Sequence, residues 1–235
     1  MTRSLGHTAM VLAAGFGIRM RPLTENTPKP LLKVLGRPII SYGFDRLRED
    51  GVSHAVVNAH YLPEQIIAWC NTVTSPATQV SDETGAILDT GGGIARALPL
   101  LGNDPFFVLN SDSFWIDRGT PALQRLRQAW TDDMDCLLLL CDPQHTTGYE
   151  GGGDFAMAED GRITPRTSNG LVYIGGYLVH PRLFRNAPTG KFSMWRLWEK
   201  AMAANRFYGL AHLGHWLHVG TPDAISQAEA ALKNL

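Results

Sequence analysis

A loop of small residues near the start of the chain limits the choice of fold more than any other feature of the sequence. It follows the apolar run of residues 8–12, which predicts a buried first strand. The loop contains Ala13, Ala14, Gly15 and Gly17, so little side-chain bulk keeps a ligand from the backbone. Free amide N–H groups at the end of a strand can hold phosphate oxygens. The sequence therefore predicts a strand that leads directly into a polyphosphate site.

Positively charged residues follow this loop at positions that suit a polyphosphate. Arg19 and Arg21 come directly after it, and Lys29 lies between Pro28 and Pro30, whose rings stiffen the backbone. The pattern is not a P-loop, which needs Gly-Lys-Ser/Thr at the start of a helix, and the dinucleotide fingerprint lacks its third glycine. A turn with merely solvated cations is the alternative, but it does not explain a lysine fixed between two prolines.

The composition is that of an ordinary globular protein. Hydrophobic residues make up 44% and charged residues 18% of the 235 residues, enough for a substantial core. The net charge of -1 gives no electrostatic footprint for nucleic acid or an anionic membrane, and no apolar stretch is long enough to span a bilayer. Cys70, Cys136 and Cys141 lack a metal-ligand spacing, so we expect buried thiols and a cytoplasmic location.

Strand and helix patterns alternate along the first 141 residues. Apolar runs predict strands, and helical spacing behind prolines or glycines predicts helices. The expected strands are 54–58, 105–110 and 134–141, and the expected helices are 38–51, 63–70, 94–101 with a glycine-rich entry from Thr90, and 120–130. This alternation predicts a three-layer α/β/α, Rossmann-like fold with a mostly parallel mixed sheet.

The later part of the chain is less regular. Asp160-Gly161 indicates a hairpin between two short strands. Further strands are expected at 171–180, 207–211 and 216–219, and helices at 193–205 and from Thr221 onward.

A carboxylate follows one of the buried strands. Asp112 comes two residues after Asn110, at the end of the apolar run that begins at residue 105. Ligands of open α/β sheets bind just past the carboxyl ends of the strands. Asp112 is therefore well placed to hold Mg²⁺, which prefers carboxylate and phosphate oxygens. A cap or turn residue is the alternative interpretation.

The string LAAGFGIRMRPLTENTPKPLLKVLGRP, residues 12–38, resembles the signature of the sugar-1-phosphate nucleotidyltransferases. The resemblance implies that an NTP and a sugar 1-phosphate give an NDP-sugar and pyrophosphate. It implies that Arg19 holds the departing β,γ-phosphates and that Lys29 bridges the α-phosphate and the incoming phosphate. It also implies Mg²⁺ on Asp112 and one domain over residues 1–235, with a nucleotide half of about 1–115 and a sugar half of about 116–235.

The same resemblance assigns the binding residues. Those expected to contact the nucleotide are Leu12, Ala13, Ala14, Gly15, Gly17, Glu83, Thr90, Gly91 and Asn110, and those expected at the sugar are Gly153, Asp154 and Gly175. Glu83 only accepts hydrogen bonds, so it can read a ring N–H of uracil, thymine or guanine but not cytosine. The glycine triplet after Thr90 is expected as a loop that lies against the base. An exposed loop acid at Glu83 and a simple strand cap at Asp154 remain the alternatives.

The sequence departs from the family at His218, where relatives usually carry an Asp that completes the metal site. Histidine is a poor Mg²⁺ ligand because this ion prefers oxygen. Asp112 with phosphates and water holds the metal, or Asp223 substitutes, or metal affinity is weakened. Relatives also carry a second phosphate lysine that is absent here, and Arg166 is a possible replacement.

The particular substrate follows from the rest of the chain. The glycine triplet, GGGDFAMAEDGRI, and FSMWRLWEKAMAANRFYGL before HWLHVGT resemble the N-acetylmuramate 1-phosphate uridylyltransferases of peptidoglycan recycling, which favours UTP. Mannose-1-phosphate guanylyltransferases, which use GTP, share the first loop and are the alternative. A non-catalytic sensor of a nucleotide or NDP-sugar is a third reading, which His218 supports and Arg19, Lys29 and Asp112 oppose. The sequence gives no oligomeric state.

Overall fold

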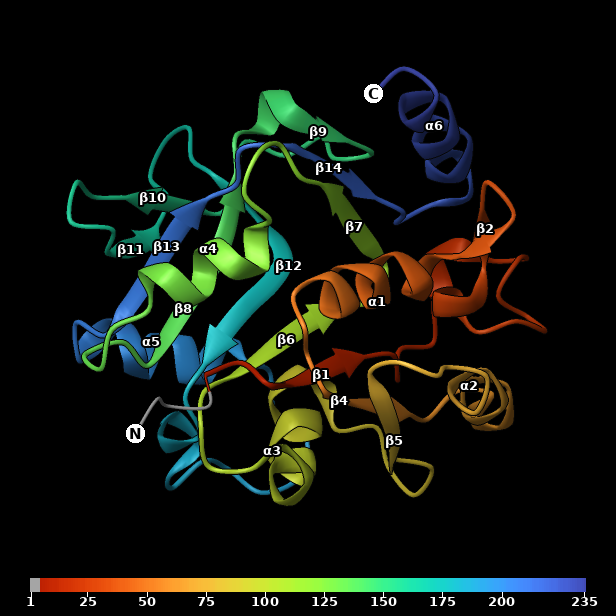
Figure 1. Ribbon diagram of the computed structural model, residues 1–235, viewed down its shortest axis with the longest axis horizontal. Helices are drawn as coiled ribbons and strands as arrows, with labels where there is room; N and C mark the ends of the chain where they lie inside the picture. Colours follow the sequence, from red (N-terminus) through yellow and green to blue (C-terminus); the bar gives the residue numbers. More distant parts are fainter. Residues whose placement is uncertain (1–4) are drawn as a thin grey trace.

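A seven-stranded mixed sheet forms the centre of the fold (Figure 1). The computed structural model describes residues 5–235. In spatial order the strands are β13 (Phe207–Ala211), β8 (Cys136–Cys141), β12 (Val172–Val179), β6 (Phe106–Asn110), β1 (Thr8–Leu12), β4 (His54–Ala59) and β5 (Ala77–Asp82). Only β12 runs antiparallel to its neighbours in this sheet of the described chain. The predicted mostly parallel mixed sheet is confirmed.

Helices cover both faces of this sheet, as the apolar strands require. One face packs against α1 (Ile39–Glu49), α2 (Pro63–Cys70) and α4 (Ala122–Ala129), and the other against α3 (Asp89–Leu101) and α5 (Trp195–Ala203). In β8, Leu137 and Leu139 join the first core whereas Leu138 and Leu140 join the second. A strand covered on both faces is apolar throughout, which explains the continuous run from Cys136 to Cys141. The predicted three-layer architecture is confirmed.

Smaller elements surround the carboxyl edge of the sheet. A third core lies under α6 (Pro222–Leu232), where it packs on β7, β14 and β2. The short strands are β2 (Lys33–Val34), β3 (Arg37–Pro38), β7 (Ser113–Ile116), β9 (Thr146–Thr147), β10 (Phe155–Met157), β11 (Ile163–Pro165) and β14 (His215–His218). Single 3-10 turns are η1 (Ile18–Met20), η2 (Lys29–Leu31), η3 (Pro143–His145) and η4 (Pro181–Phe184).

The main sheet draws strands from both halves of the chain. β12, from the later half, lies between β6 and β8 and pairs with both. The hairpin predicted about Asp160-Gly161 is present as β10 and β11. Among residues 5–235, no helix combines the length and apolar character needed to cross a membrane.

Five strands of the described chain and one glycine segment differ from the sequence-based expectation, and three of these strands are the two-residue β2, β3 and β9. β5 was not predicted because it lies at the sheet edge, where exposed residues alternate with partly buried ones and most of the side chains are polar. β7 was not predicted either, since it begins only one residue after Asp112. The glycine triplet is not a loop: Gly91, Gly92 and Gly93 lie inside the first turns of α3. The expectation of a loop at this position was wrong.

His212 is a buried histidine whose protonation opposes folding. It follows β13, with Nδ1 3.9 Å from Asp117 Oδ1 and its ring 6.2 Å from that of Trp115. Burial lowers the pKa of His212 from 6.5 to about 4, because the attraction of Asp117 offsets only part of the desolvation and Arg125 adds to it. The folded protein therefore holds this ring neutral well below the pH at which the unfolded chain would charge it.

Acid is expected to destabilise the fold through His212. The free energy of unfolding should fall as the pH drops from about 6.5 toward about 4, by about 2.5 kcal/mol at pH ~4.5 from this group. Urea unfolding of the wild type and of His212→Gln at pH ~7 and pH ~4.5 measures the effect. The carboxylates contribute equally in both proteins, so the wild type should lose more stability than the variant. Equal losses would contradict the assignment.

Candidate active site

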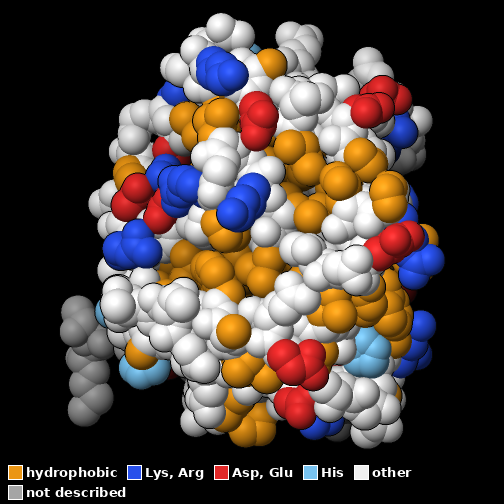
Figure 2. All heavy atoms as spheres, turned by 90° about the vertical axis from the view of Figure 1, so that its right-hand side faces the viewer, with side chains coloured by type: hydrophobic (Ala, Val, Ile, Leu, Met, Phe, Trp, Pro, Cys, Tyr) orange, Lys and Arg blue, Asp and Glu red, His pale blue; other side chains and the backbone are white. Residues whose placement is uncertain are grey.

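A pocket of about 520 Å³ opens where the carboxyl ends of β1, β4 and β6 meet. Figure 2 views the molecule from the side toward which β1 points in Figure 1. Apolar side chains form the middle of this face, and Lys and Arg side chains gather beside them. The pocket lies at the edge of an open α/β sheet where ligands characteristically bind.

The first loop forms one wall of the pocket through its backbone. A Cβ atom on Gly15 would meet nothing within 4 Å, so the backbone here faces open space. Gly17 has φ +62°, and a Cβ there would approach Lys29 Cβ and Thr24 Cγ2 to 3.0 Å. Glycine is needed at position 17 for both reasons, because L-residues rarely adopt this conformation. The loop thus presents its backbone to a ligand, as the sequence predicted.

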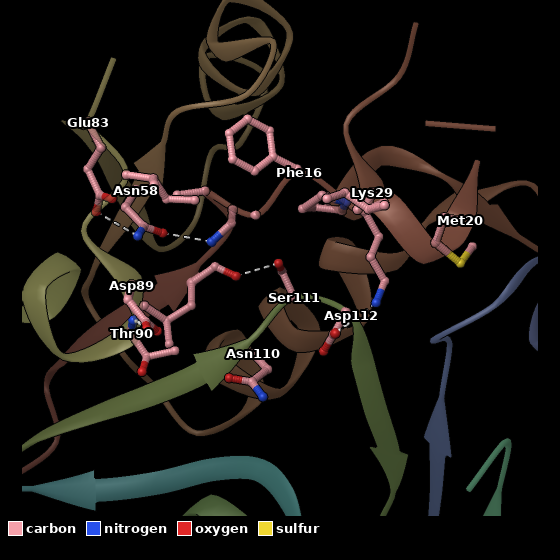
Figure 3. A pocket seen from close by; sticks show the side chains of 18 of the residues that line it. Phe16, Met20, Lys29, Asn58, Glu83, Asp89, Thr90, Asn110, Ser111 and Asp112 are labelled. Atoms are coloured by element: carbon pink, nitrogen blue, oxygen red, sulfur yellow. Dashed lines mark hydrogen bonds and ion pairs between the residues drawn. The ribbon is translucent and has the colours of Figure 1, made fainter. Parts of the chain in front are cut away.

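Hydrogen bonds from buried side chains hold the start of this loop in place. Asn58, at the end of β4, accepts a hydrogen bond from the Ala13 amide at 2.7 Å and donates to Glu83 Oε1 at 2.7 Å (Figure 3). Glu83 is 2% exposed, and burial raises its pKa, while the hydrogen bond from Asn58 opposes the rise. Ser111 donates to the carbonyl of Leu12 at 2.5 Å from the other side. Glu83 is therefore a buried acid that lines the pocket and not an exposed loop residue.

The opposite end of the pocket carries the phosphate-binding candidates. Lys29 Nζ lies 2.8 Å from Asp112 Oδ2, although 83 residues separate them in sequence. Lys29 is 9% exposed because it begins η2 between Pro28 and Pro30 and lies against the loop. Arg19, on η1, lines the same pocket and is exposed to solvent. Two cations, Lys29 and Arg19, therefore lie near the carboxylate of Asp112 in one pocket.

Charge compensation keeps Asp112 ionised. Burial alone would raise its pKa, but Lys29, His218 and Arg19 lower it below its ordinary value. The Val219 amide donates to the Asp112 carbonyl at 3.0 Å, and His218 pairs with Ser113 across β14 and β7. This pairing brings His218 beside Asp112, where burial and the two cations lower the imidazole pKa. Asp112 opposes this lowering of the His218 pKa but does not cancel it.

The donor set suits a metal that arrives with phosphates. No group of three or more His, Cys, Asp or Glu side chains gathers as a metal centre within residues 5–235. Asp223 lies exposed in the first turn of α6 and does not line the pocket. Asp112 can supply one carboxylate oxygen, and Mg²⁺ is commonly held by one or two carboxylates together with substrate phosphates. The residues present fit Mg²⁺ in that mode and do not form a complete protein cage.

Most of the predicted nucleotide and phosphate residues meet in this pocket. They are Leu12, Ala13, Ala14, Gly15, Gly17, Arg19, Lys29, Glu83, Thr90, Asn110 and Asp112. The structure also brings in Asn58, Asp89, Ser111 and Lys191, which the sequence did not single out. Asn58 could have been found by its position at a strand end, whereas no local signal marks Lys191.

The predicted sugar residues do not line this pocket. Asp154 Oδ2 accepts a hydrogen bond from the Tyr173 amide at 2.8 Å, as a strand cap would. The Gly153 amide donates to the Tyr149 hydroxyl at 3.1 Å. Gly175 has φ +83°, and a Cβ there would lie 2.9 Å from Ser113 Oγ. Their assignment to the sugar stays a prediction, and each of the three has a structural role of its own.

The glycine triplet makes room for neighbouring parts of the protein. A Cβ on Gly91 would lie 2.4 Å from the Phe192 ring, and one on Gly92 would lie 2.3 Å from the Gly190 carbonyl oxygen. A Cβ on Gly93 would lie 2.7 Å from Glu83 Oε1. Gly91 does not line the pocket, and the Thr90 hydroxyl accepts a hydrogen bond from the Met194 amide. These contacts give the glycines a structural reason, and their contact with a base stays a prediction.

Backbone amides, two cations and a strand-end carboxylate at the edge of a mixed α/β sheet suit the transfer of a nucleotidyl group between phosphates. The fold and the pocket thus define a nucleotide-binding transferase. The chain belongs to the nucleotidyl transferase family, whose sequence profile matches residues 8–234. This membership confirms the predicted enzyme class, a sugar-1-phosphate nucleotidyltransferase.

Individual relatives match nearly end to end. The chain is 40% identical over 232 residues to the N-acetylmuramate alpha-1-phosphate uridylyltransferase of Caulobacter vibrioides, covering 95% of this chain and 96% of the relative. It is 36% identical over 227 residues to the enzyme of that name from Neisseria meningitidis serogroup B, covering 94% and 96%. A crystal structure of UDP-glucose pyrophosphorylase complexed with UDP-glucose superposes with a TM-score of 0.80 over 98% and 99% of the two chains. At 16% identity, that likeness bears on the fold alone.

Proposed function

We propose that this chain transfers the uridylyl group of UTP to N-acetylmuramate 1-phosphate, giving UDP-N-acetylmuramate and pyrophosphate, in the cytoplasm. The site observation that carries the proposal is the meeting of Lys29, Asp112 and Arg19 in one pocket. The choice of UTP and of this sugar rests on the two uridylyltransferases, which match almost the whole chain. The weaker alternative is GTP with mannose 1-phosphate, because a buried Glu83 also suits guanine.

The reaction needs positioning more than proton transfer. An oxygen of the sugar phosphate is already an anionic nucleophile and attacks the α-phosphorus of UTP. The bond from this phosphorus to the bridging oxygen of the β-phosphate breaks, and its electron pair leaves with pyrophosphate. The protein must hold two anions in line and neutralise the charge between them. No general base is required.

Lys29 and Arg19 bind different phosphates. Lys29 lies at the centre of the phosphate end and bridges the α-phosphate and the incoming sugar phosphate. Arg19 stands on η1 at the exposed side and holds the β,γ-phosphates that leave. Backbone amides around Gly15 support the triphosphate where no side chain intervenes.

Asp112 would hold Mg²⁺ together with phosphate oxygens and water. The ion would supply charge neutralisation for the triphosphate. His218 adds an imidazole ring beside Asp112, and Asp223 lies outside the pocket. Of the three arrangements left open by the sequence, Asp112 with phosphates and water is the one that these positions support.

Glu83 reads the base at the other end. Its carboxylate accepts the N3–H of uracil, and burial with Asn58 holds it in one orientation. Arg166, the suggested second phosphate residue, donates to the Ser168 carbonyl and does not line the pocket, so it has no phosphate role in this mechanism.

Pyrophosphate release with purified protein tests the proposal. The assay uses Mg²⁺ and either UTP or GTP with a panel of sugar 1-phosphates that includes those of N-acetylmuramate and mannose. We expect turnover with UTP and N-acetylmuramate 1-phosphate. Turnover only with GTP and mannose 1-phosphate would establish the alternative. Nucleotide binding without turnover across the panel would point to the sensor.

A further inference from the structure

The mechanism above leaves one cationic side chain of the pocket unused. Lys191 lines the pocket from the segment between η4 and α5, in the later half of the chain. Its side chain is exposed and, among residues 5–235, makes no ion pair with a carboxylate. A lysine without an anionic partner at the wall of a nucleotide pocket is available to donate to a ligand.

The backbone around Lys191 is fixed to the first turns of α3. Phe192 N donates to the Leu88 carbonyl at 3.1 Å, and the amides of Gly91 and Gly92 donate to the Phe192 carbonyl at 3.0 and 3.1 Å. Two residues further on, the Met194 amide donates to Thr90 Oγ1 at 2.9 Å. Lys191 therefore does not sit on a freely moving loop, and its side chain starts from a defined point.

The glycines of α3 are the sequence feature that permits this arrangement. Gly91 and Gly92 leave space for the Phe192 ring and the Gly190 carbonyl, at 2.4 and 2.3 Å from where their Cβ atoms would be. Glycine inside a helix costs about 1 kcal/mol relative to alanine. The contacts of the docked segment offset that cost. The same segment carries Lys191, whose exposed side chain lines the pocket.

The backbone on either side of Lys191 is held at the end of the pocket where Asp89 and Thr90 lie. Figure 3 shows Glu83, Asp89 and Thr90 at one end and Lys29 and Asp112 at the other. The segment that carries Lys191 docks on residues 88–92, the wall that Asp89 and Thr90 belong to. The phosphate end is already supplied with Arg19 and Lys29.

We propose that Lys191 determines base specificity by donating a hydrogen bond to a carbonyl oxygen of the nucleobase, while Glu83 accepts from the adjacent ring N–H. This inference rests on the proposed function and deepens it. An ammonium only donates and a carboxylate only accepts, so the pair matches a base edge with C=O next to N–H. Uracil has that edge. Cytosine has an amino group at the 4-position and an unprotonated ring nitrogen beside it. The Lys191 ammonium would then face another donor, and the Glu83 carboxylate would face another acceptor.

The test compares the affinity of UTP and CTP, measured calorimetrically with Mg²⁺, for the wild type, Lys191→Met and Lys191→Arg. Methionine keeps the length of the side chain without its charge, and arginine keeps the donor. We expect Lys191→Met to weaken UTP binding about tenfold and CTP binding less than about threefold, as for loss of a charged hydrogen bond. Lys191→Arg should retain most of the UTP preference. Lys233→Met, an exposed lysine at the end of α6, is the matched control and should change neither affinity.

Uracil analogues identify the partner atom. In 4-thio-UTP and 2-thio-UTP, sulfur replaces one carbonyl oxygen and the ring N–H remains. For the analogue that lacks the contacted oxygen, Lys191→Met should cost little further affinity. Equal weakening of UTP, CTP and both thio analogues in Lys191→Met would place Lys191 on the phosphates or in the fold and overturn the proposal.

The proposed function and this inference can fail separately. Nucleotide affinity does not depend on which sugar phosphate is accepted, so failure with N-acetylmuramate 1-phosphate leaves the Lys191 test intact. If the wild type binds GTP and not UTP, the proposed function fails, and the affinity ratio of GTP to ATP then tests Lys191. An unchanged ratio in Lys191→Met would overturn the role.

Discussion

Replacing Lys29 with alanine is expected to lower kcat by a factor of about 100 to 1,000, as does the loss of one positioned donor at a developing charge in other enzymes. Lys29 is fixed by two prolines and is 9% exposed, so water cannot easily replace its charge. The change removes the group that bridges the two reacting phosphates. KM for UTP should change less than kcat, because Arg19 and the backbone amides still bind the triphosphate. Steady-state kinetics with UTP and N-acetylmuramate 1-phosphate measures both constants.

The fold should survive this substitution. Asp112 loses its ion pair, but its side chain is 31% exposed and water from the pocket can solvate it. A melting temperature within a few degrees of the wild type, together with retained UTP binding, would show that the loss is chemical. Lys33→Ala, at an exposed position in β2, is the matched control and should keep wild-type turnover. Near-wild-type kcat in Lys29→Ala would remove Lys29 from the mechanism.

The features predicted correctly are those that depend on neighbours in sequence. Pro38 followed by apolar residues at helical spacing predicted α1, and the apolar run after Pro105 predicted β6. The spacing of Arg19 and Lys29 from the glycines is itself the motif, and both line the pocket, while their phosphate roles stay predictions. Asp112 was found because strand ends at a carboxyl edge are where ligands bind.

The features that were missed depend on contacts between distant parts of the chain. Asn58 accepts a hydrogen bond from the Ala13 amide across 45 residues, and its position at a strand end does not show which group it contacts. The segment from Gly190 to Met194 docks on α3 across about 100 residues, so the reason for the glycine triplet could not be read locally. The edge strand β5 lacks an apolar pattern because one of its sides pairs with no strand in the described sheet.

The second large effect is expected at Asp112 and His218. Asp112→Asn should lower kcat about 100-fold or more, because the amide removes the carboxylate charge beside Lys29 and leaves Lys29 without its partner. His218→Asp should act in the opposite direction on metal affinity. A second carboxylate beside Asp112 offers the oxygen ligand that Mg²⁺ prefers over imidazole. The Mg²⁺ concentration for half-maximal activity should therefore fall in His218→Asp.

Direct metal binding separates these effects from catalysis. Mn²⁺, which can replace Mg²⁺ at oxygen ligands and is visible by electron paramagnetic resonance, can be titrated with and without UTP. If Asp112 with phosphates forms the site, the wild type should bind Mn²⁺ tightly only when UTP is present, and Asp112→Asn should lose this coupling. His218→Asp should bind Mn²⁺ even without UTP, since the new carboxylate at position 218 would lie beside that of Asp112, where β6 and β14 end. Tight Mn²⁺ binding by the nucleotide-free wild type would instead mean that His218 is itself a ligand, and the site would then favour ions that accept nitrogen over Mg²⁺.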